Sequence, residues 1–338
     1  MMPYSLLSFP FKYASSGIVV GSSVLVGTLL YLRYCMRRES IEHKNYVVLI
    51  TGCDSGLGYS LASHCRQRGL SVLAGCLNKN SEGALDLEEK GAFIIELDLT
   101  KFETVQNALK LTRRYMELNR DKEFRAIVNN AAVMCFGEFE WLTKDIISHE
   151  IQVNLTGTLL FTNVFSSLVR NSKARIINIT SHCADACLPG LSVYGATKAG
   201  LKAWNDALRV ELKKFGVDVI LFLPGAFFGQ SNILANQEEK TIAMKGHMQE
   251  DVLEYYQDYF ERYFTYIHSF SKKVPLHQIE NAEIYTNFDH AIFSDKPKFL
   301  YKISPLRYSV YHFLFNIMPT KVRDILVENF VSMPRWKE

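Results

Sequence analysis

The chain of 338 residues is long enough for one large domain or two small ones, and its 48% hydrophobic and 22% charged residues are ordinary for a globular protein. A formal net charge of +3 is too small to indicate nucleic-acid binding. The seven cysteines are scattered and form no CxxC pair, which argues against a disulfide framework and favours reduced thiols that face the cytosol.

A membrane anchor is predicted near the N-terminus, because Ile18 to Leu32 is almost wholly apolar. This stretch is slightly shorter than the ~20 residues of a typical spanning helix, but its neighbours extend it. A cleaved signal peptide is the alternative, yet such a peptide carries its positive charges first, whereas Arg33, Arg37 and Arg38 follow the apolar run. We therefore predict an uncleaved anchor within residues 1–40, in the endoplasmic reticulum or, alternatively, the mitochondrion, with the rest of the chain in the cytosol.

The first predicted strand, Tyr46 to Ile50, leads directly into a glycine-rich turn, Gly52 to Gly58, and then into a helix from Tyr59 to Arg68. Strand, glycine turn and helix in this order are the context that a dinucleotide fingerprint requires. The glycines let the backbone approach a pyrophosphate, and the N-terminus of the helix favours its negative charge. This part of the chain therefore predicts a dinucleotide site.

The second and third strands leave the choice of dinucleotide nearly open. The second strand, Ser71 to Cys76, ends beside Leu77 and Asn78, where an acidic residue would bind the ribose of NAD or a basic one the extra phosphate of NADP. Neither type is present at these positions. After the third strand, Ala92 to Glu96, Asp98 can reach the adenine edge, cap the following helix, or do both.

Small residues, Asn130-Ala131-Ala132, follow the fourth predicted strand, Arg125 to Asn129, and let the chain pass close to a flat ring. The amphipathic pattern from Ile146 to Val169 then predicts one long helix with Asn154 in its interior. Asparagine is unfavourable inside a helix, so Asn154 is expected either to bond locally or to hold a water.

The strongest chemical signal follows the fifth predicted strand, Ala174 to Ile179, which delivers Ser181 at its end. Tyr194 and Lys198 begin the next helix and, four residues apart, lie on one face of it. An ammonium there would lower the pKa of a phenol from its usual value of about 10. Such a tyrosine can exchange a proton with a substrate alcohol or carbonyl, while the serine hydroxyl holds the same oxygen.

Strands alternate with helices as far as a sixth strand, Val217 to Phe222, which precedes Pro224-Gly225. The alternation predicts an α/β fold, a Rossmann-type doubly wound parallel sheet with helices on both faces, in a catalytic domain of residues 41–300. Ligands of such sheets gather at the carboxyl ends of the strands. Five candidate residues fall just past strand ends: Gly52, Asp98, Asn130, Ser181 and Pro224.

Two later regions show helical patterns of aromatic residues. From Phe227 to His290 the pattern indicates either packing between helices or a movable lid over an apolar substrate. The tail, residues 301–338, either completes the core, covers the substrate or lies on a bilayer. His182, Cys183 and Cys187 supply only three soft ligands on a loop, so no metal site is predicted.

Taken in order, these motifs resemble those of the short-chain dehydrogenases/reductases over about residues 45–229. The matching residues are Thr51-Gly-x-x-x-Gly-x-Gly58, Asn129-Asn-Ala-Ala132, Asn154, Ser181, Tyr194-x-x-x-Lys198 and Pro224-Gly225. The resemblance implies that Tyr194 is the catalytic acid/base and that Lys198 tunes it and binds ribose. It also implies that Ser181 binds the substrate oxygen and that Asn154 holds a relay water. The cofactor residues that it implies are Gly52, Ser55, Gly56, Leu57, Gly58, Asp98, Asn130, Tyr194, Lys198, Pro224 and Gly225.

Finer details are similar to one branch of that family, the retinol, hydroxysteroid and 3-hydroxybutyrate dehydrogenases: the turn Ile50 to Gly58, the non-acidic Ala74 to Leu77 and the tail segment Met318 to Leu326. The resemblance implies NAD as cofactor, with NADP as the alternative. It implies a lipophilic alcohol or ketone as substrate, a steroid or sterol, ecdysteroids included. Retinol or 3-hydroxybutyrate is the alternative substrate, and a non-catalytic dinucleotide-binding scaffold is the alternative function. A homodimer or homotetramer is implied through the helices near 142–170 and 194–215.

The segment after Ser181 departs from the family pattern, which usually has glycine and smaller residues there. We expect His182 and Asp185 to crowd or polarise the substrate pocket. Substrate preferences therefore do not transfer directly from relatives.

Overall fold

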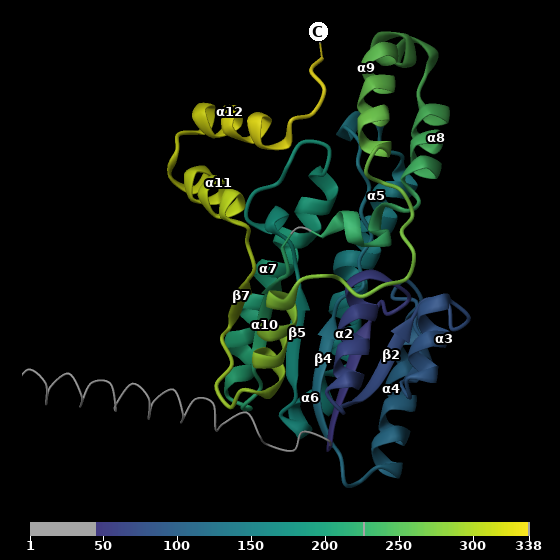
Figure 1. Ribbon diagram of the computed structural model, residues 1–338, viewed down its shortest axis with the longest axis vertical. Helices are drawn as coiled ribbons and strands as arrows, with labels where there is room; N and C mark the ends of the chain where they lie inside the picture. The colour runs from purple at the N-terminus through teal and green to yellow at the C-terminus, as the bar shows by residue number, and fades with distance from the viewer. Residues whose placement is uncertain (1–44, 226, 337–338) are drawn as a thin grey trace, which may run out of the picture. The chain divides into compact units, whose positions relative to one another are not determined.

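The computed structural model describes residues 45–225 and 227–336, and these form a parallel sheet with helices on both faces (Figure 1). No helix within these ranges is long and apolar enough to cross a membrane. The predicted anchor, Ile18 to Leu32, lies outside the described residues.

Seven strands form the sheet in the order β3-β2-β1-β4-β5-β6-β7, and all neighbouring pairs are parallel. The sequence predicts the first six strands closely, and misses the seventh because its three residues are too short to show a pattern. The order reverses between β1 and β4, the point at which ligands of such sheets bind. The strands are β1 (Tyr46–Thr51), β2 (Ser71–Cys76), β3 (Phe93–Glu96), β4 (Glu123–Asn129), β5 (Arg175–Ile179), β6 (Val219–Leu223) and β7 (Leu300–Lys302).

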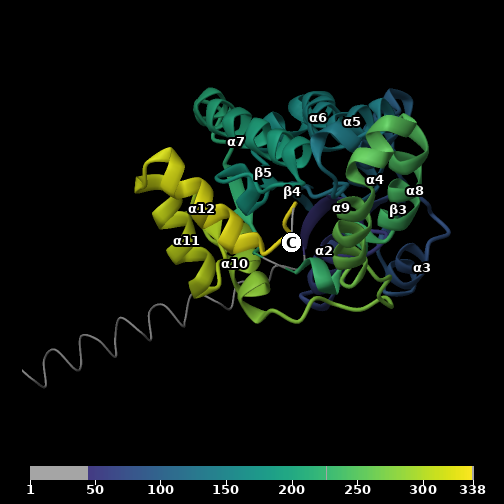
Figure 2. The same ribbon diagram turned by 90° about the horizontal axis from the view of Figure 1, so that it is seen from above.

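Successive residues of a strand point to opposite faces, and this divides the core in two. Val48 and Ile50 are buried on one face and Val47 and Leu49 on the other. The first face is covered by α2 (Gly56–Gln67), α3 (Glu82–Glu89) and α10 (Ala282–Phe293), and Figure 2 shows helices on both faces. The second is covered by α4 (Phe102–Leu118), α6 (Thr158–Ser172) and α7 (Ser192–Lys213).

The long helix predicted around Asn154 is present, with one local change. Helix α5 (Lys144–Ile151) passes into a π-helical segment, Gln152–Gly157, and this continues into α6. A π-helical turn widens the helix by one residue and often marks a functional site. Asn154 is fully buried within that turn.

The segment with the aromatic pattern after Phe227 contains two helices, α8 (Gln237–His247) and α9 (Glu250–His268). They lie side by side above the carboxyl ends of the strands (Figure 1). Rings of α9 surround the buried Trp141, with centroid distances of 5.0 Å to Tyr263 and 5.1 Å to Phe260. Packing between elements therefore accounts for most of these aromatic side chains.

The tail contains two further helices, α11 (Leu306–Ile317) and α12 (Thr320–Val331). Each begins directly after a proline, Pro305 or Pro319, a residue type that favours helix starts and interrupts helices. The buried side of α11 includes His312 and Phe315, which pack against Phe330 of α12 or against the loop after β5.

Candidate active site

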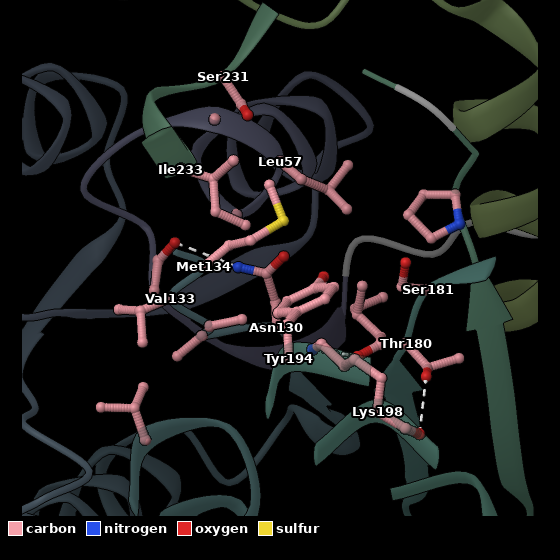
Figure 3. A pocket seen from close by; sticks show the side chains of 18 of the residues that line it. Leu57, Asn130, Val133, Met134, Thr180, Ser181, Tyr194, Lys198, Ser231 and Ile233 are labelled. Atoms are coloured by element: carbon pink, nitrogen blue, oxygen red, sulfur yellow. Dashed lines mark hydrogen bonds between the residues drawn. The ribbon is translucent and has the colours of Figure 1, made fainter. Parts of the chain in front are cut away.

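One cavity of about 460 Å³ lies at the carboxyl ends of the strands, where the sheet order reverses (Figure 3). Its volume falls in the range of about 300–1,000 Å³ that is usual for small-molecule sites. Loops after β1, β3, β4, β5 and β6 contribute to its wall, together with α7, α11 and α12. All the predicted cofactor residues line it: Gly52, Ser55, Gly56, Leu57, Gly58, Asp98, Asn130, Tyr194, Lys198, Pro224 and Gly225.

The turn between β1 and α2 is shaped by close contacts with the loop after β4. Gly52 has a φ of +72°, and a Cβ added there would lie 2.8 Å from the Cα of Ala131. The side-chain amide of Asn130 donates to the carbonyls of Thr51 and Gly52, at 2.8 and 3.2 Å. Thr51 in turn accepts the backbone amides of Asn130 and Ala131 through its hydroxyl, each at 3.0 Å. These bonds fix the turn against its neighbour.

Asp54 is a cavity residue that the sequence patterns did not single out. Its carboxylate accepts the backbone amides of Leu77 and Asn78, at 2.8 and 3.0 Å, and so lies at the carboxyl end of β2. Lys79, the nearest basic residue along the chain, instead lies 3.9 Å from Glu96. The end of β2 is therefore acidic in space although its own residues are not.

Asp98 lines the cavity and also organises its own loop. One carboxylate oxygen accepts from both the amide and the hydroxyl of Thr100, at 2.9 and 2.7 Å, and the other lies 3.3 Å from the Lys101 ammonium. Burial opposes the charge of Asp98, but these partners hold its pKa below the ordinary value. The expected cavity position is observed, but the expected helix cap is not: the carboxylate accepts from Thr100, and the N-cap residue of α4 is Lys101.

Ser181, Tyr194 and Lys198 lie together on the cavity wall (Figure 3). Ser181 ends the extended segment after β5 and accepts the Cys183 amide at 3.2 Å. Lys198 is buried, donates to the Ile179 carbonyl at 3.3 Å, and places its ammonium 5.7 Å from the centre of the Tyr194 ring. The order Ser181, Tyr194, Lys198 in the chain thus becomes one compact group in space.

The electrostatics of this group differ from the expectation that a nearby cation lowers the phenol pKa. Burial raises the pKa of Tyr194 above its usual range, and the Ser181 hydroxyl lowers it only in part. Burial also lowers the pKa of Lys198 to about 8. In a desolvated site neither charged form is favoured, so the protein alone does not ionise the tyrosine.

Asn154 is the predicted site residue that does not line the cavity. It lies behind the loop that follows β4, where its side chain exchanges two hydrogen bonds of 2.8 Å with the backbone of Val133. It also donates to the hydroxyl of Thr197, at 3.3 Å. The local bonding expected of this interior asparagine is not observed, because its partners, Val133 and Thr197, lie on other segments of the chain.

The segment after Ser181 contributes His182 to the cavity wall, but not Asp185. Asp185 pairs with Lys202 and with Lys302, the latter at 2.9 Å, and ties α7 to β7. Of the two residues expected to crowd or polarise the pocket, only His182 lines it. Three residues of the tail also line the cavity, which single positions in the sequence did not indicate: Tyr308, His312 and Phe330.

Residues 46–240 match the family model described as short chain dehydrogenase. Among curated relatives, the mitochondrial D-beta-hydroxybutyrate dehydrogenase of Bos taurus is 35% identical over 223 residues, 64% of this chain and 64% of that protein. The alignment therefore spans just under two thirds of that relative. The 17-beta-hydroxysteroid dehydrogenase type 6 of Bos taurus is 32% identical over 285 residues, 82% of this chain and 87% of that protein.

Among solved structures, a short-chain dehydrogenase from Streptomyces avermitilis is similar, with a TM-score of 0.58 and 19% identity. The similarity covers 85% of this chain and 97% of that one. At this level of identity it shows a shared fold.

Proposed function

The chain belongs to the short-chain dehydrogenase family, and from this premise we propose that it transfers hydride between a nicotinamide dinucleotide and a secondary alcohol or ketone. The observation that carries the proposal is that Ser181, Tyr194 and Lys198 line the same cavity as the glycine turn after β1. A dinucleotide site and a proton-transfer group in one cavity are what this reaction requires.

The residues of the turn fit such a cofactor. A Cβ at Gly58 would lie 2.0 Å from the carbonyl oxygen of Gly52, so no other residue type is accommodated at this position. Glycine at this position lets the start of α2 pack directly against the turn, as in dinucleotide-binding turns, where the N-terminus of the helix favours the pyrophosphate charge. When bound, the nicotinamide ring would accept or supply the hydride.

The chain's own residues would handle the proton. Tyr194 would donate its phenolic proton to the carbonyl oxygen during reduction, and take it from the alcohol during oxidation. Ser181 would donate a hydrogen bond to the same oxygen. Because burial raises the pKa of Tyr194, its ionised form needs a positive charge close by, which Lys198 provides while it is protonated. Asn154 would act indirectly, by holding Val133 of the cavity wall and by supporting a relay water.

NAD is the cofactor that the site favours over NADP. The Asp54 carboxylate lies at the end of β2, beside the amides of Leu77 and Asn78. A negative charge there can accept a hydrogen bond from ribose hydroxyls and repels the additional phosphate of NADP. Lys79, which could have offset that charge, is next to Glu96.

The substrate that we propose is lipophilic, a steroid or sterol. The cavity wall includes large apolar side chains that belong to one cluster with Tyr194: Met134, Leu188, Leu191 and Ile233. Burial of apolar surface on such walls favours a hydrophobic molecule. The relative named as a hydroxybutyrate dehydrogenase makes 3-hydroxybutyrate a useful comparison substrate, and the sequence resemblance adds retinol.

We also propose a membrane-associated enzyme, anchored within residues 1–40 on the endoplasmic reticulum, with its catalytic region in the cytosol. The apolar run from Ile18 to Leu32 and the arginines after it support this. A second support is α11, whose residues Leu306 and Phe313 are 81% and 63% exposed. Such a surface suits contact with lipid. Assembly through α5, α6 and α7 into a dimer or tetramer remains part of the proposal.

The test is dinucleotide reduction or oxidation by the full-length protein in detergent, with NAD and NADP and a panel of hydroxysteroids, retinol and 3-hydroxybutyrate. We expect turnover of a steroid, and a kcat/KM for NAD at least about tenfold above that for NADP. A folded protein that binds neither dinucleotide would overturn the proposed function. Turnover of 3-hydroxybutyrate alone would overturn the lipophilic substrate.

A further inference from the structure

Three polar rings meet on the cavity wall beside Ser181. His182 comes from the segment after β5, and Tyr308 and His312 come from α11, one helical turn apart. The ring centre of His182 lies 4.9 Å from that of His312 and 5.4 Å from that of Tyr308. The tail thus supplies polar groups to a cavity whose other walls near Tyr194 are largely apolar.

His182 has a structural partner that fixes its tautomer. Its Nε2 lies 3.0 Å from the carbonyl oxygen of Ile303, which can only accept, so Nε2 carries the proton and donates it. This bond joins the segment after Ser181 to the chain between β7 and α11. His182 therefore positions the tail against the site.

His312 has no such partner. It is only 5% exposed and lines the cavity, yet within residues 45–225 and 227–336 neither of its ring nitrogens forms a hydrogen bond. Neither nitrogen is among the fully enclosed unpaired polar atoms of the described residues, so both stay accessible from the cavity. A cavity-lining imidazole in this state is suited to a ligand that completes its hydrogen bonds.

The charge state of His312 narrows the chemistry of that ligand. Burial, with smaller contributions from His182 and Lys302, lowers its pKa to about 4, and Asp185 opposes this only weakly. At neutral pH the ring is therefore uncharged, with one N–H donor and one acceptor nitrogen. A neutral imidazole binds a hydroxyl or a carbonyl well and gives no advantage to a carboxylate.

We propose that His312 binds a second oxygen function of the substrate, a hydroxyl or carbonyl other than the group that reacts at Ser181 and Tyr194. This inference rests on the proposed function and deepens it. The substrate is then a lipophilic molecule with at least two oxygen functions, and α11 determines its specificity. A site that hydrogen-bonds such a group discriminates strongly against analogues that lack it.

The experiment measures binding to the full-length protein with NAD, by calorimetry, for a set of ketosteroids. Each member carries one hydroxyl at a different ring position and is compared with its analogue without that hydroxyl. We expect at least one hydroxyl to increase affinity by about tenfold or more in the unmodified protein. His312→Phe, which keeps an aromatic ring against His182, should abolish that increase, whereas His312→Gln, which keeps a donor and an acceptor, should retain part of it.

Phe315→Leu is the matched control, because Phe315 packs 5.7 Å from the His312 ring, is buried in the same helix and does not line the cavity. This variant should retain the tenfold increase. The proposal is overturned if no hydroxyl improves binding to the unmodified protein, or if the increase survives in His312→Phe. Turnover is measured separately. Hydroxyl-selective binding without turnover supports the His312 contact and contradicts hydride transfer. Turnover without hydroxyl-selective binding supports hydride transfer and contradicts the His312 contact.

Discussion

The side chain of Asn154 holds both backbone groups of Val133: its Oδ1 accepts the Val133 amide and its Nδ2 donates to the Val133 carbonyl, each at 2.8 Å. Val133 and the following Met134 line the cavity, whereas Asn154 lies behind them. A residue outside the cavity thus fixes the position of a wall. The π-helical turn Gln152–Gly157 is what presents Asn154 to that loop.

Asn154→Ala should destabilise the protein by roughly 2 kcal/mol, because it leaves two partly buried backbone groups of Val133 unpaired. Urea unfolding followed by circular dichroism measures this. Asn287→Ala is the control: Asn287 is half-buried on α10 and its side chain donates only to the Glu283 carbonyl within its own helix. It should change stability by less than about 0.5 kcal/mol. Equal effects of the two substitutions would contradict the role of Asn154.

Gly58→Ala should prevent correct formation of the turn after β1. The added Cβ would lie 2.0 Å from the Gly52 oxygen and 2.5 Å from Nδ2 of Asn130. We expect a loss of about 3 kcal/mol or more of stability and loss of dinucleotide binding in calorimetry. Gly246→Ala is matched, since Gly246 is also helical and has nothing within 4 Å of an added Cβ. Gly246→Ala should instead raise the free energy of unfolding by about 0.5 kcal/mol.

Glu150 should make stability depend on pH in a defined direction. It is buried, accepts the Cys135 amide at 3.1 Å with one oxygen, and has no partner for the other among the described residues. Burial raises its pKa from the ordinary 4.5 to about 7, despite opposing contributions from Lys240 and Lys198. The folded state therefore holds the extra proton between these pH values. The contribution of protonated Glu150 to the free energy of unfolding is therefore present below pH 4.5 and is lost as pH rises through 7.

Glu150→Gln removes this titration while keeping an acceptor for Cys135. Relative to the unmodified protein, the variant should gain about 3 kcal/mol in free energy of unfolding between pH 4.5 and pH 8. Denaturant unfolding at a series of pH values gives the comparison. If the free energies of unfolding of the two proteins change with pH in parallel, the raised pKa of Glu150 is contradicted.

The outer side of α11 should contact lipid in the membrane-bound protein. Four exposed apolar residues at helical spacing share this side: Leu306, Val310, Phe313 and Ile317. In full-length protein reconstituted with brominated lipids, a tryptophan introduced by Phe313→Trp should be quenched. One introduced by Ile242→Trp, at an exposed position of α8, should not be. Equal quenching of both would contradict lipid contact through α11.

The sequence predicted the sheet well because buried parallel strands are short β-branched runs and glycines mark the turn after the first of them. Six strands, the helix that contains Asn154 and the grouping of Ser181, Tyr194 and Lys198 were recognisable in this way. Each of these features depends on residues that are neighbours along the chain or on a periodic pattern.

Other features depend on contacts that no local pattern encodes. Asp54 lies in the turn after β1 but contacts the end of β2. His312 lines the same cavity as Ser181, although more than a hundred residues separate the two in the sequence. The direction of the Tyr194 pKa shift also differs from the expectation, since helical spacing reveals the nearby cation of Lys198 but not the burial that raises this pKa. Burial is a property of the assembled fold, and so was not available from spacing alone.

The most direct test of the proposed chemistry is Tyr194→Phe, assayed with NAD and the best alcohol of the substrate panel. It should reduce turnover by at least about a thousandfold while leaving the dissociation constant for NAD within about threefold. Tyr263→Phe is the matched control, because Tyr263 is equally buried, its hydroxyl has no partner among the described residues and it does not line the cavity. That control should keep full turnover. Turnover by Tyr194→Phe within about tenfold of the unmodified protein would contradict the assignment of Tyr194 as the proton-transfer group.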